Sequence, residues 1–262
     1  MKLSIPSLSE NKNIVVSEFT LDDFRSISFM INNENDIELY EFLISKIETP
    51  CNAFDKFYTL LKSRVLFVDE SITFNNGESN ISINLNVWDY IIKNDYVDIK
   101  TEIVFENIKV FINYPEHLIY NNYEDLVIDC IIKISLDDKE LDFCELCRED
   151  KYKLIDRLPP TLMISIKDYI STILNDELVI MQPKLNLPKI GVNVFNGSAF
   201  EIIKTLFNYY KYDDILELIF MLSKRVNDIG YINSRTPKDL DLLVKLYSEE
   251  VEKTTNDDKL NI

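Results

Sequence analysis

The stretch Ile108-Lys-Val-Phe-Ile-Asn113 places a branched apolar residue at every second position. Successive side chains of a β-strand point to opposite faces, so this alternation is typical of a strand with one buried face. Residues 81–87 show the same pattern, with Ile, Leu and Val alternating with Ser and Asn. We therefore predict a small antiparallel sheet within residues 71–114, which includes a further strand at 99–105 and a short helical turn at 88–93.

The sequence on both sides of this sheet changes to helical spacing. Two short extended pieces at 2–5 and 13–16 predict a hairpin at the start of the chain. Thr20 then lies three residues before Asp23, which is the spacing of a capping box at the start of a helix. By apolar spacing, the predicted helices cover residues 20–31, 36–47, 53–65, 124–135, 150–158 and 161–174. Helices and strands in separate stretches predict an α+β fold, with helices packed around a small antiparallel sheet.

Residues 182–195 interrupt these patterns with Pro183, Pro188 and Gly191. Stretches rich in Pro and Gly are typical of domain boundaries. The apolar spacing beyond this stretch predicts three more helices, at 198–210, 213–227 and 237–252. The predicted organisation is an α+β domain at 1–180, a linker at 181–197, a small all-helical module at 198–253 and a flexible tail at 254–262.

The charge of the chain limits the partners that it can bind. The 262 residues include 28 Lys and Arg against 45 Asp and Glu, a formal net charge of −17. Binding to nucleic-acid phosphates or to an anionic membrane surface requires clustered Lys and Arg, so neither partner is expected. Every long apolar run is interrupted by charged residues, and residues 1–9 do not resemble a signal peptide, so we expect no membrane span and a cytoplasmic location.

The residue types needed for enzyme chemistry are scarce. His117 is the only histidine, it lies in a polar, turn-like stretch, and the four glycines are scattered rather than gathered in a phosphate-binding loop. Cys144 and Cys147 are spaced like zinc ligands, but no second pair accompanies them. The acidic run at 137–142 is typical of a solvated turn. We therefore expect no catalytic residue, no cofactor and no metal site.

Two groups of residues in the predicted helical module are candidates for contact with a partner protein. Aromatic residues dominate both protein cores and the energetically important parts of interfaces, so the aromatic group at 207–212 fits either role. The last predicted helix carries an apolar stripe that also fits both. The candidate interface residues are Phe207, Tyr209, Tyr210, Tyr212, Leu240, Leu243 and Tyr247.

The N-terminal stretch Leu3-Ser-Ile-Pro-Ser-Leu8, followed by residues 14–19 and 20–27, resembles the opening of the T-even-type bacteriophage baseplate hub assembly proteins. The resemblance covers residues 2–175 and includes the patterns at 53–74 and 124–174. The usual end of that family is replaced here by the helices after residue 198. Within these helices, the stretches 218–227 and 236–247 are similar to a second, small hub-assembly factor of the same phages.

This resemblance implies a non-enzymatic role in the assembly of a contractile-tail baseplate, as a chaperone or as a minor structural component. The implied partners are other phage baseplate hub or tail proteins, and the implied location is the host cytoplasm or the virion. The charge of −17 keeps an alternative open, namely an acidic mimic of nucleic acid that inhibits a host DNA-binding protein. Its acidic residues are dispersed among lysines, however, which disfavours a phosphate-like stripe.

Overall fold

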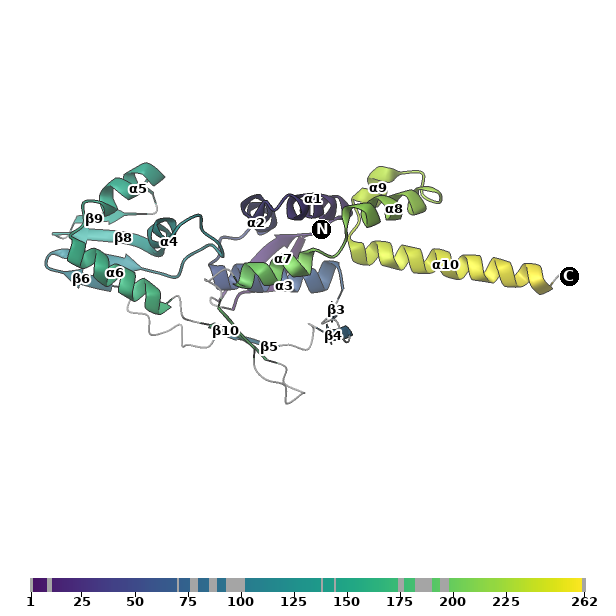
Figure 1. The fold of residues 1–262 in the computed structure, drawn as a ribbon, viewed down its shortest axis with the longest axis horizontal. Helices are drawn as coiled ribbons and strands as arrows, with labels where there is room; N and C mark the ends of the chain where they lie inside the picture. Colours follow the sequence, from purple (N-terminus) through teal and green to yellow (C-terminus); the bar gives the residue numbers. More distant parts are fainter. Residues whose placement is uncertain are drawn as a thin grey trace.

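The protein has an α+β fold, as the sequence predicts (Figure 1). The computed structural model describes residues 2–8, 11–69, 71–75, 80–84, 89–92, 102–137, 139–143, 145–173, 177–181, 190–193 and 198–260. In Figure 1 a four-stranded sheet with its helices occupies one end of the molecule, and a group of helices with a two-stranded hairpin occupies the middle.

The middle of the molecule is formed by the first 68 residues and the helices that pack on them. Its first elements agree with the prediction: β1 (Lys2–Pro6), β2 (Asn13–Ser17), α1 (Leu21–Asn32), α2 (Asp36–Ser45) and α3 (Ala53–Phe67). Thr20 caps α1 as predicted, because its hydroxyl accepts from the Asp23 amide at 3.3 Å while the Asp23 carboxylate accepts from the Thr20 amide at 2.8 Å. The capped helix buries its Leu21, Phe24 and Ile27 face in the core.

The four-stranded antiparallel sheet has the strand order β6-β7-β8-β9. Its strands and helices are β6 (Glu102–Phe105), β7 (Ile108–Ile112), α4 (Tyr123–Cys130), β8 (Ile131–Leu136), β9 (Lys139–Asp142), α5 (Arg148–Ile155) and α6 (Pro160–Ile173). Val110 of β7 lies opposite Ile134 of β8, and both side chains are buried. The described residues of the acidic run 137–142 are exposed, as predicted, but only Asp137 among them lies in the turn, because residues 139–142 form strand β9.

The predicted helix at 124–135 is wrong in its second half. The helix ends at Cys130, and the chain continues directly as β8. Residues 131–136 form a strand because they pair with β7. Without β8, the backbone hydrogen-bonding groups on one edge of β7 would have no partner strand, and β8 pairs with that edge along its whole length. The apolar residues of 131–134 fit the helical spacing and the strand equally well, so the pairing partner decides between them.

Residues 71–114 do not form one sheet, which corrects the prediction. β3 (Ser71–Asn75) and β4 (Asn80–Asn84) pair only with each other among the described strands. The predicted helical turn at 88–93 is wrong for residues 89–92, which the structure describes. They form the strand β5 (Asp89–Ile92), which pairs with β10 (Glu177–Met181). A segment of four residues is too short to show a period, so a partner strand about 90 positions away in the sequence decides its structure. The rest of that turn, and residues 85–87 of the predicted strand at 81–87, lie outside the described residues.

The helices after residue 198 pack into the same core as the N-terminal helices. These helices are α7 (Ser198–Phe207), α8 (Tyr212–Ser223), α9 (Ile229–Asn233) and α10 (Pro237–Leu260). The Phe207 ring centroid lies 4.9 Å from that of Phe19 and 6.1 Å from that of Phe24. The Leu21 amide donates to the Arg235 carbonyl at 2.8 Å. The predicted division into folding units stays a prediction. Within the predicted linker, β11 (Ile190–Asn193) pairs with β10.

The last helix is longer than predicted. α10 continues to Leu260, beyond the expected helix end at residue 252, and its C-terminal part projects from the rest of the molecule (Figure 1). No Gly or Pro occurs in 238–260, so nothing in the backbone ends the helix, and each added residue gains one backbone hydrogen bond. Among the described residues, no helix is long and apolar enough to cross a bilayer.

Candidate functional site

The segment 113–122 connects β7 to α4 and also contacts the helices in the middle of the molecule. The Tyr114 ring meets the Phe54 ring of α3 edge-on, with centroids 5.1 Å apart. The Lys56 ammonium of α3 donates to the Glu116 carbonyl at 2.7 Å. This segment therefore joins the four-stranded sheet to the helical part of the fold.

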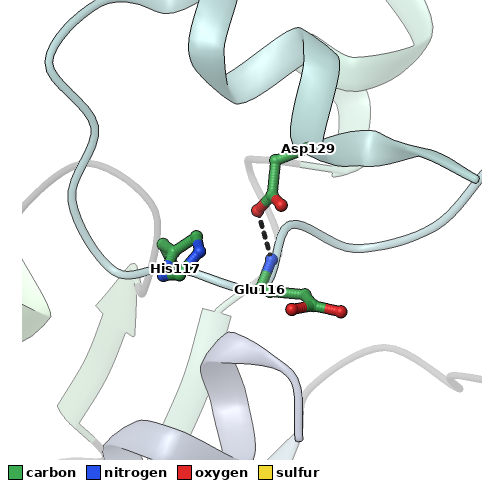
Figure 2. Close-up of side chains that lie close together, drawn as sticks. All are labelled: Glu116, His117 and Asp129. Carbon is green, nitrogen blue, oxygen red and sulfur yellow. Dashed lines mark hydrogen bonds between the residues drawn. The ribbon is translucent and has the colours of Figure 1, made fainter. Parts of the chain in front are cut away.

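Asp129, in the last turn of α4, organises this segment. Its Oδ2 atom accepts from the Glu116 amide at 2.7 Å and from the Tyr120 hydroxyl. Figure 2 shows the Asp129 side chain reaching from α4 toward the segment, with the Glu116 amide directly in front of it. The Tyr120 oxygen in turn accepts from the His117 amide at 2.9 Å, so one carboxylate fixes residues 116–120, directly and through Tyr120.

His117 is half-buried between two tyrosines. The Tyr40 hydroxyl lies 3.5 Å from His117 Nδ1 and accepts from the Leu118 amide at 3.0 Å. Burial lowers the pKa of His117, and the nearby Lys56 ammonium lowers it further. The imidazole is therefore neutral at pH 7. Burial also raises the pKa values of Tyr40 and Tyr120, so both phenols stay protonated and act as hydrogen-bond donors and acceptors.

Glu116, His117 and Asp129 bring three potential metal-ligand atoms together, and all of these atoms lie within 4.8 Å of one another. A cavity of about 360 Å³ beside them is lined by Tyr40, His117 and Asp129. The sequence prediction of no metal site did not identify this cluster. Asp129 lies twelve positions after His117, a spacing that matches no short metal-binding motif, so only the fold brings the carboxylate back to the histidine.

The cysteines offer no comparable site within the described residues. Cys51 and Cys130 are buried, and burial raises the pKa of the Cys51 thiol to about 11, which keeps the unreactive protonated form. The Cys147 thiol donates to the Asp150 carboxylate at 3.1 Å in the first turn of α5. Cys144 lies outside the described residues.

The candidate interface residues divide between the core and the surface. Phe207 and Leu240 are fully buried, so the interface prediction is wrong for these two, because a side chain without exposed surface cannot contact a partner. Tyr210 meets Phe24 edge-on at 6.2 Å, and Leu243 and Tyr247 are partly buried against the core. Tyr209 stacks on the Arg64 guanidinium at 4.6 Å, and Tyr212 is 38% exposed. For the residues that keep exposed surface, the interface role stays a prediction.

Several large apolar side chains exposed on α8 and α10 are ones that the sequence did not single out. They are Leu216, Phe220 and Met221 of α8 and Leu242 and Leu246 of α10. A groove of about 450 Å³ is lined by side chains of both helices, including Met221, Val244 and Tyr247. Most of the circumference of α8 is apolar in the sequence, apart from the side of Asp213, Asp214 and Glu217, so the spacing could not show which apolar side faces the solvent.

Comparison with known proteins adds no further information on this surface or on the Asp129 cluster. No protein-family model, no curated protein and no solved structure matches the chain. The resemblance to phage hub assembly proteins stays a prediction.

Proposed function

We propose that the protein is a non-enzymatic assembly factor for the baseplate hub of a contractile phage tail, and that it binds another hub or tail protein through α8. The observation that carries the binding role is an exposed apolar stripe on this helix, formed by Tyr212, Leu216 and Phe220. The resemblance of the sequence to hub assembly proteins supplies the class of partner.

The stripe follows the geometry of a helix that docks on another protein. Its residues are spaced at i, i+4 and i+8, so their side chains lie in one row along the helix. They are 38%, 44% and 64% exposed, in the order in which they occur along the helix. Single exposed apolar residues are ordinary, whereas an aligned row of large ones marks an interaction surface. The opposite side of α8 already attaches the helix to the core through Ile215 and Leu222.

The charges beside the stripe favour a partner helix that carries basic residues next to its own apolar row. Asp213 and Glu217 are exposed beside the stripe, together with the Lys224 ammonium, which lies 4.4 Å from the Phe220 ring centroid, and the whole chain carries a charge of −17. Two copies of so acidic a chain repel each other, whereas a basic partner is attracted. Burying a large apolar side chain contributes about 1.5–3 kcal/mol, so the three residues of the stripe supply a favourable term of the same order as the free-energy cost of association, about 4–15 kcal/mol.

Two matched substitutions test this proposal. Phe220→Asp and Phe29→Asp change phenylalanines that are 64% and 62% exposed, the first on α8 and the second on α1. Tagged wild-type protein and the F29D variant should co-purify defined hub or tail proteins from phage-infected cells, whereas F220D should lose them while it keeps the wild-type melting temperature.

Equal co-purification of the hub proteins by F220D and wild type would contradict the role of α8. Recovery of a host polymerase or nuclease alone, without any hub or tail protein, would contradict the assembly role and favour the acidic mimic.

A further inference from the structure

We propose that Glu116, His117 and Asp129 form a binding site for a divalent transition-metal ion, with Zn²⁺ as the ion that fits best. One imidazole and two carboxylates come together from the 113–122 segment and the last turn of α4 (Figure 2). Imidazole nitrogen is a ligand for zinc, copper and nickel rather than for calcium or magnesium, which prefer oxygen ligands alone. This inference is independent of the proposed protein-binding surface on α8.

The distances suit a site that closes on its ion. Zinc–ligand bonds of about 2.0–2.2 Å in a tetrahedron put the ligand atoms roughly 3.4 Å apart. The three ligand atoms now lie within 4.8 Å of one another, so a shift of about 1 Å or less in each, within the reach of small side-chain rotations, closes the site. The Glu116 side chain is exposed and has the freedom to make the largest part of this movement.

Hydrogen bonds orient two of the three proposed ligands, Asp129 and His117. Asp129 uses Oδ2 to accept from the Glu116 amide and from Tyr120, and among the described residues no hydrogen bond occupies its Oδ1. The Tyr40 hydroxyl lies 3.5 Å from His117 Nδ1, and with the proton on Nδ1 the Nε2 lone pair is available to the ion. Tyr40 and Tyr120 thus occupy the places of the outer partners that orient metal ligands in known sites.

The local charge also favours a cation. The charged groups that act on His117 are the Lys56 ammonium and the carboxylates of Glu41, Glu116 and Asp129, a balance of one positive against three negative charges. Arg148 and Lys151 also line the cavity beside the cluster, where Arg148 pairs with Asp125 and the Lys151 ammonium lies 5.5 Å from the Phe143 ring centroid.

An ion can reach the cluster from either side of the segment. His117 and Asp129 line one cavity of about 360 Å³, while Glu116 and Asp129 line another of about 370 Å³. Three protein ligands leave a fourth position for water, which the open side of these cavities supplies. A bound ion would fasten the 113–122 segment to α4, and so would strengthen the joint between the sheet and the helices.

Isothermal titration of the full chain with zinc chloride tests the site, supported by the visible absorption spectrum of the Co²⁺-loaded protein. Wild type should bind one ion per chain and melt at a higher temperature with zinc than without it. Glu116→Gln and His117→Asn should each weaken zinc binding at least about tenfold, because each removes a ligand. Glu124→Gln, which removes an exposed carboxylate from the same helix as Asp129, is the matched control and should bind zinc as wild type does.

Three results would overturn the proposal: no saturable binding of one ion per chain at zinc concentrations up to about 100 micromolar, which is at least about 10³ times the dissociation constant of a typical structural site; equal affinity in E116Q and wild type; or equal weakening in E116Q and E124Q. Melting curves without metal establish that each variant is folded. Should H117N fail to fold, E116Q decides the question alone, because its side chain is exposed and the substitution keeps the amide that donates to Asp129.

Discussion

At the scale of single residues, polar side chains near helix ends determine where the helices of this protein begin and how its loops are held. Thr20, Asn52 and Asn122 each accept a hydrogen bond from the backbone amide three residues ahead. Such caps act within four residues, so the sequence alone predicts them, as it did for Thr20. Asp129 acts on partners 9 and 13 residues away, and no local pattern reveals that role.

Replacing Thr20 by Ala should lower the free energy of unfolding by about 1 kcal/mol, because the first turn of α1 loses its capping acceptor. Urea denaturation followed by circular dichroism measures the change. Ser26→Ala is the control, since its hydroxyl bonds back to the Asp22 carbonyl within the same helix and caps nothing. A loss in S26A as large as in T20A would show that the capping bond does not stabilise α1.

Asp241 of α10 should make the protein less stable as the pH rises. Burial chiefly raises its pKa above the ordinary value of 3.8, against the lowering effects of Lys245 and Tyr210. The folded state therefore binds the proton more tightly than the unfolded state. Stability is highest below pH 3.8 with respect to this group, and it falls as the pH rises through the higher pKa of the folded state.

Urea denaturation at a series of pH values, with Asp241→Asn beside wild type, tests this expectation. The uncharged amide should leave D241N more stable than wild type at pH 7, and the difference should shrink as the pH falls toward 3.8. A variant that is less stable than wild type at pH 7 would show that the ionised carboxylate makes favourable contacts that outweigh its burial.

At the scale of elements, apolar spacing predicts where helices lie but not which side of them is buried. α8 has apolar residues around most of its circumference, and its Ile215 side faces the core while its Phe220 side faces the solvent. Residues 131–136 show a related ambiguity, because branched apolar residues suit a helix and a strand, and the neighbouring β7 makes them a strand. In both cases the neighbouring element decides the outcome: which side of α8 is buried, and whether residues 131–136 form a helix or a strand.

Phe207→Ala should lower the free energy of unfolding by about 3–5 kcal/mol, because it leaves a cavity between α7 and α1 where the Phe207 ring meets Phe19 and Phe24. Thr205→Ala, which changes an exposed side chain two residues earlier in α7, should change it by less than about 0.5 kcal/mol. Urea denaturation of both variants measures the difference. Similar values for the two would show that α7 does not depend on this packing.

At the scale of the whole molecule, the two ends of the chain share one core, and the four-stranded sheet is formed by the residues between them. The buried Arg64 of α3 donates to the Leu206 carbonyl of α7 at 2.9 Å, across 142 positions of sequence. Lys204 of α7 pairs with Asp36 of α2 at 2.5 Å. The helices that a sequence pattern separates by a Pro-rich stretch are thus joined in space by a buried hydrogen bond and a partly exposed ion pair.

A fragment of residues 1–180 should lose cooperative unfolding, because removing α7 exposes Phe19 and Phe24 and leaves the buried Arg64 guanidinium without the Leu206 carbonyl. Urea denaturation and the dispersion of amide resonances compare the fragment with the full chain. A sharp, wild-type-like transition in the fragment would instead support an independent domain at 1–180 and a separate helical module.

The sequence by itself determined the α+β class, the N-terminal hairpin, the capped start of α1 and most helix positions, because periodicity and capping act over a few neighbouring residues. Only the tertiary structure decided that β5 and β8 are strands, that Phe207 and Leu240 lie in the core, and that the Phe220 side of α8 faces the solvent. It also decided that Asp129 lies beside His117. Each of these outcomes depends on a partner distant in the sequence, and local patterns carry no information about which distant segments meet.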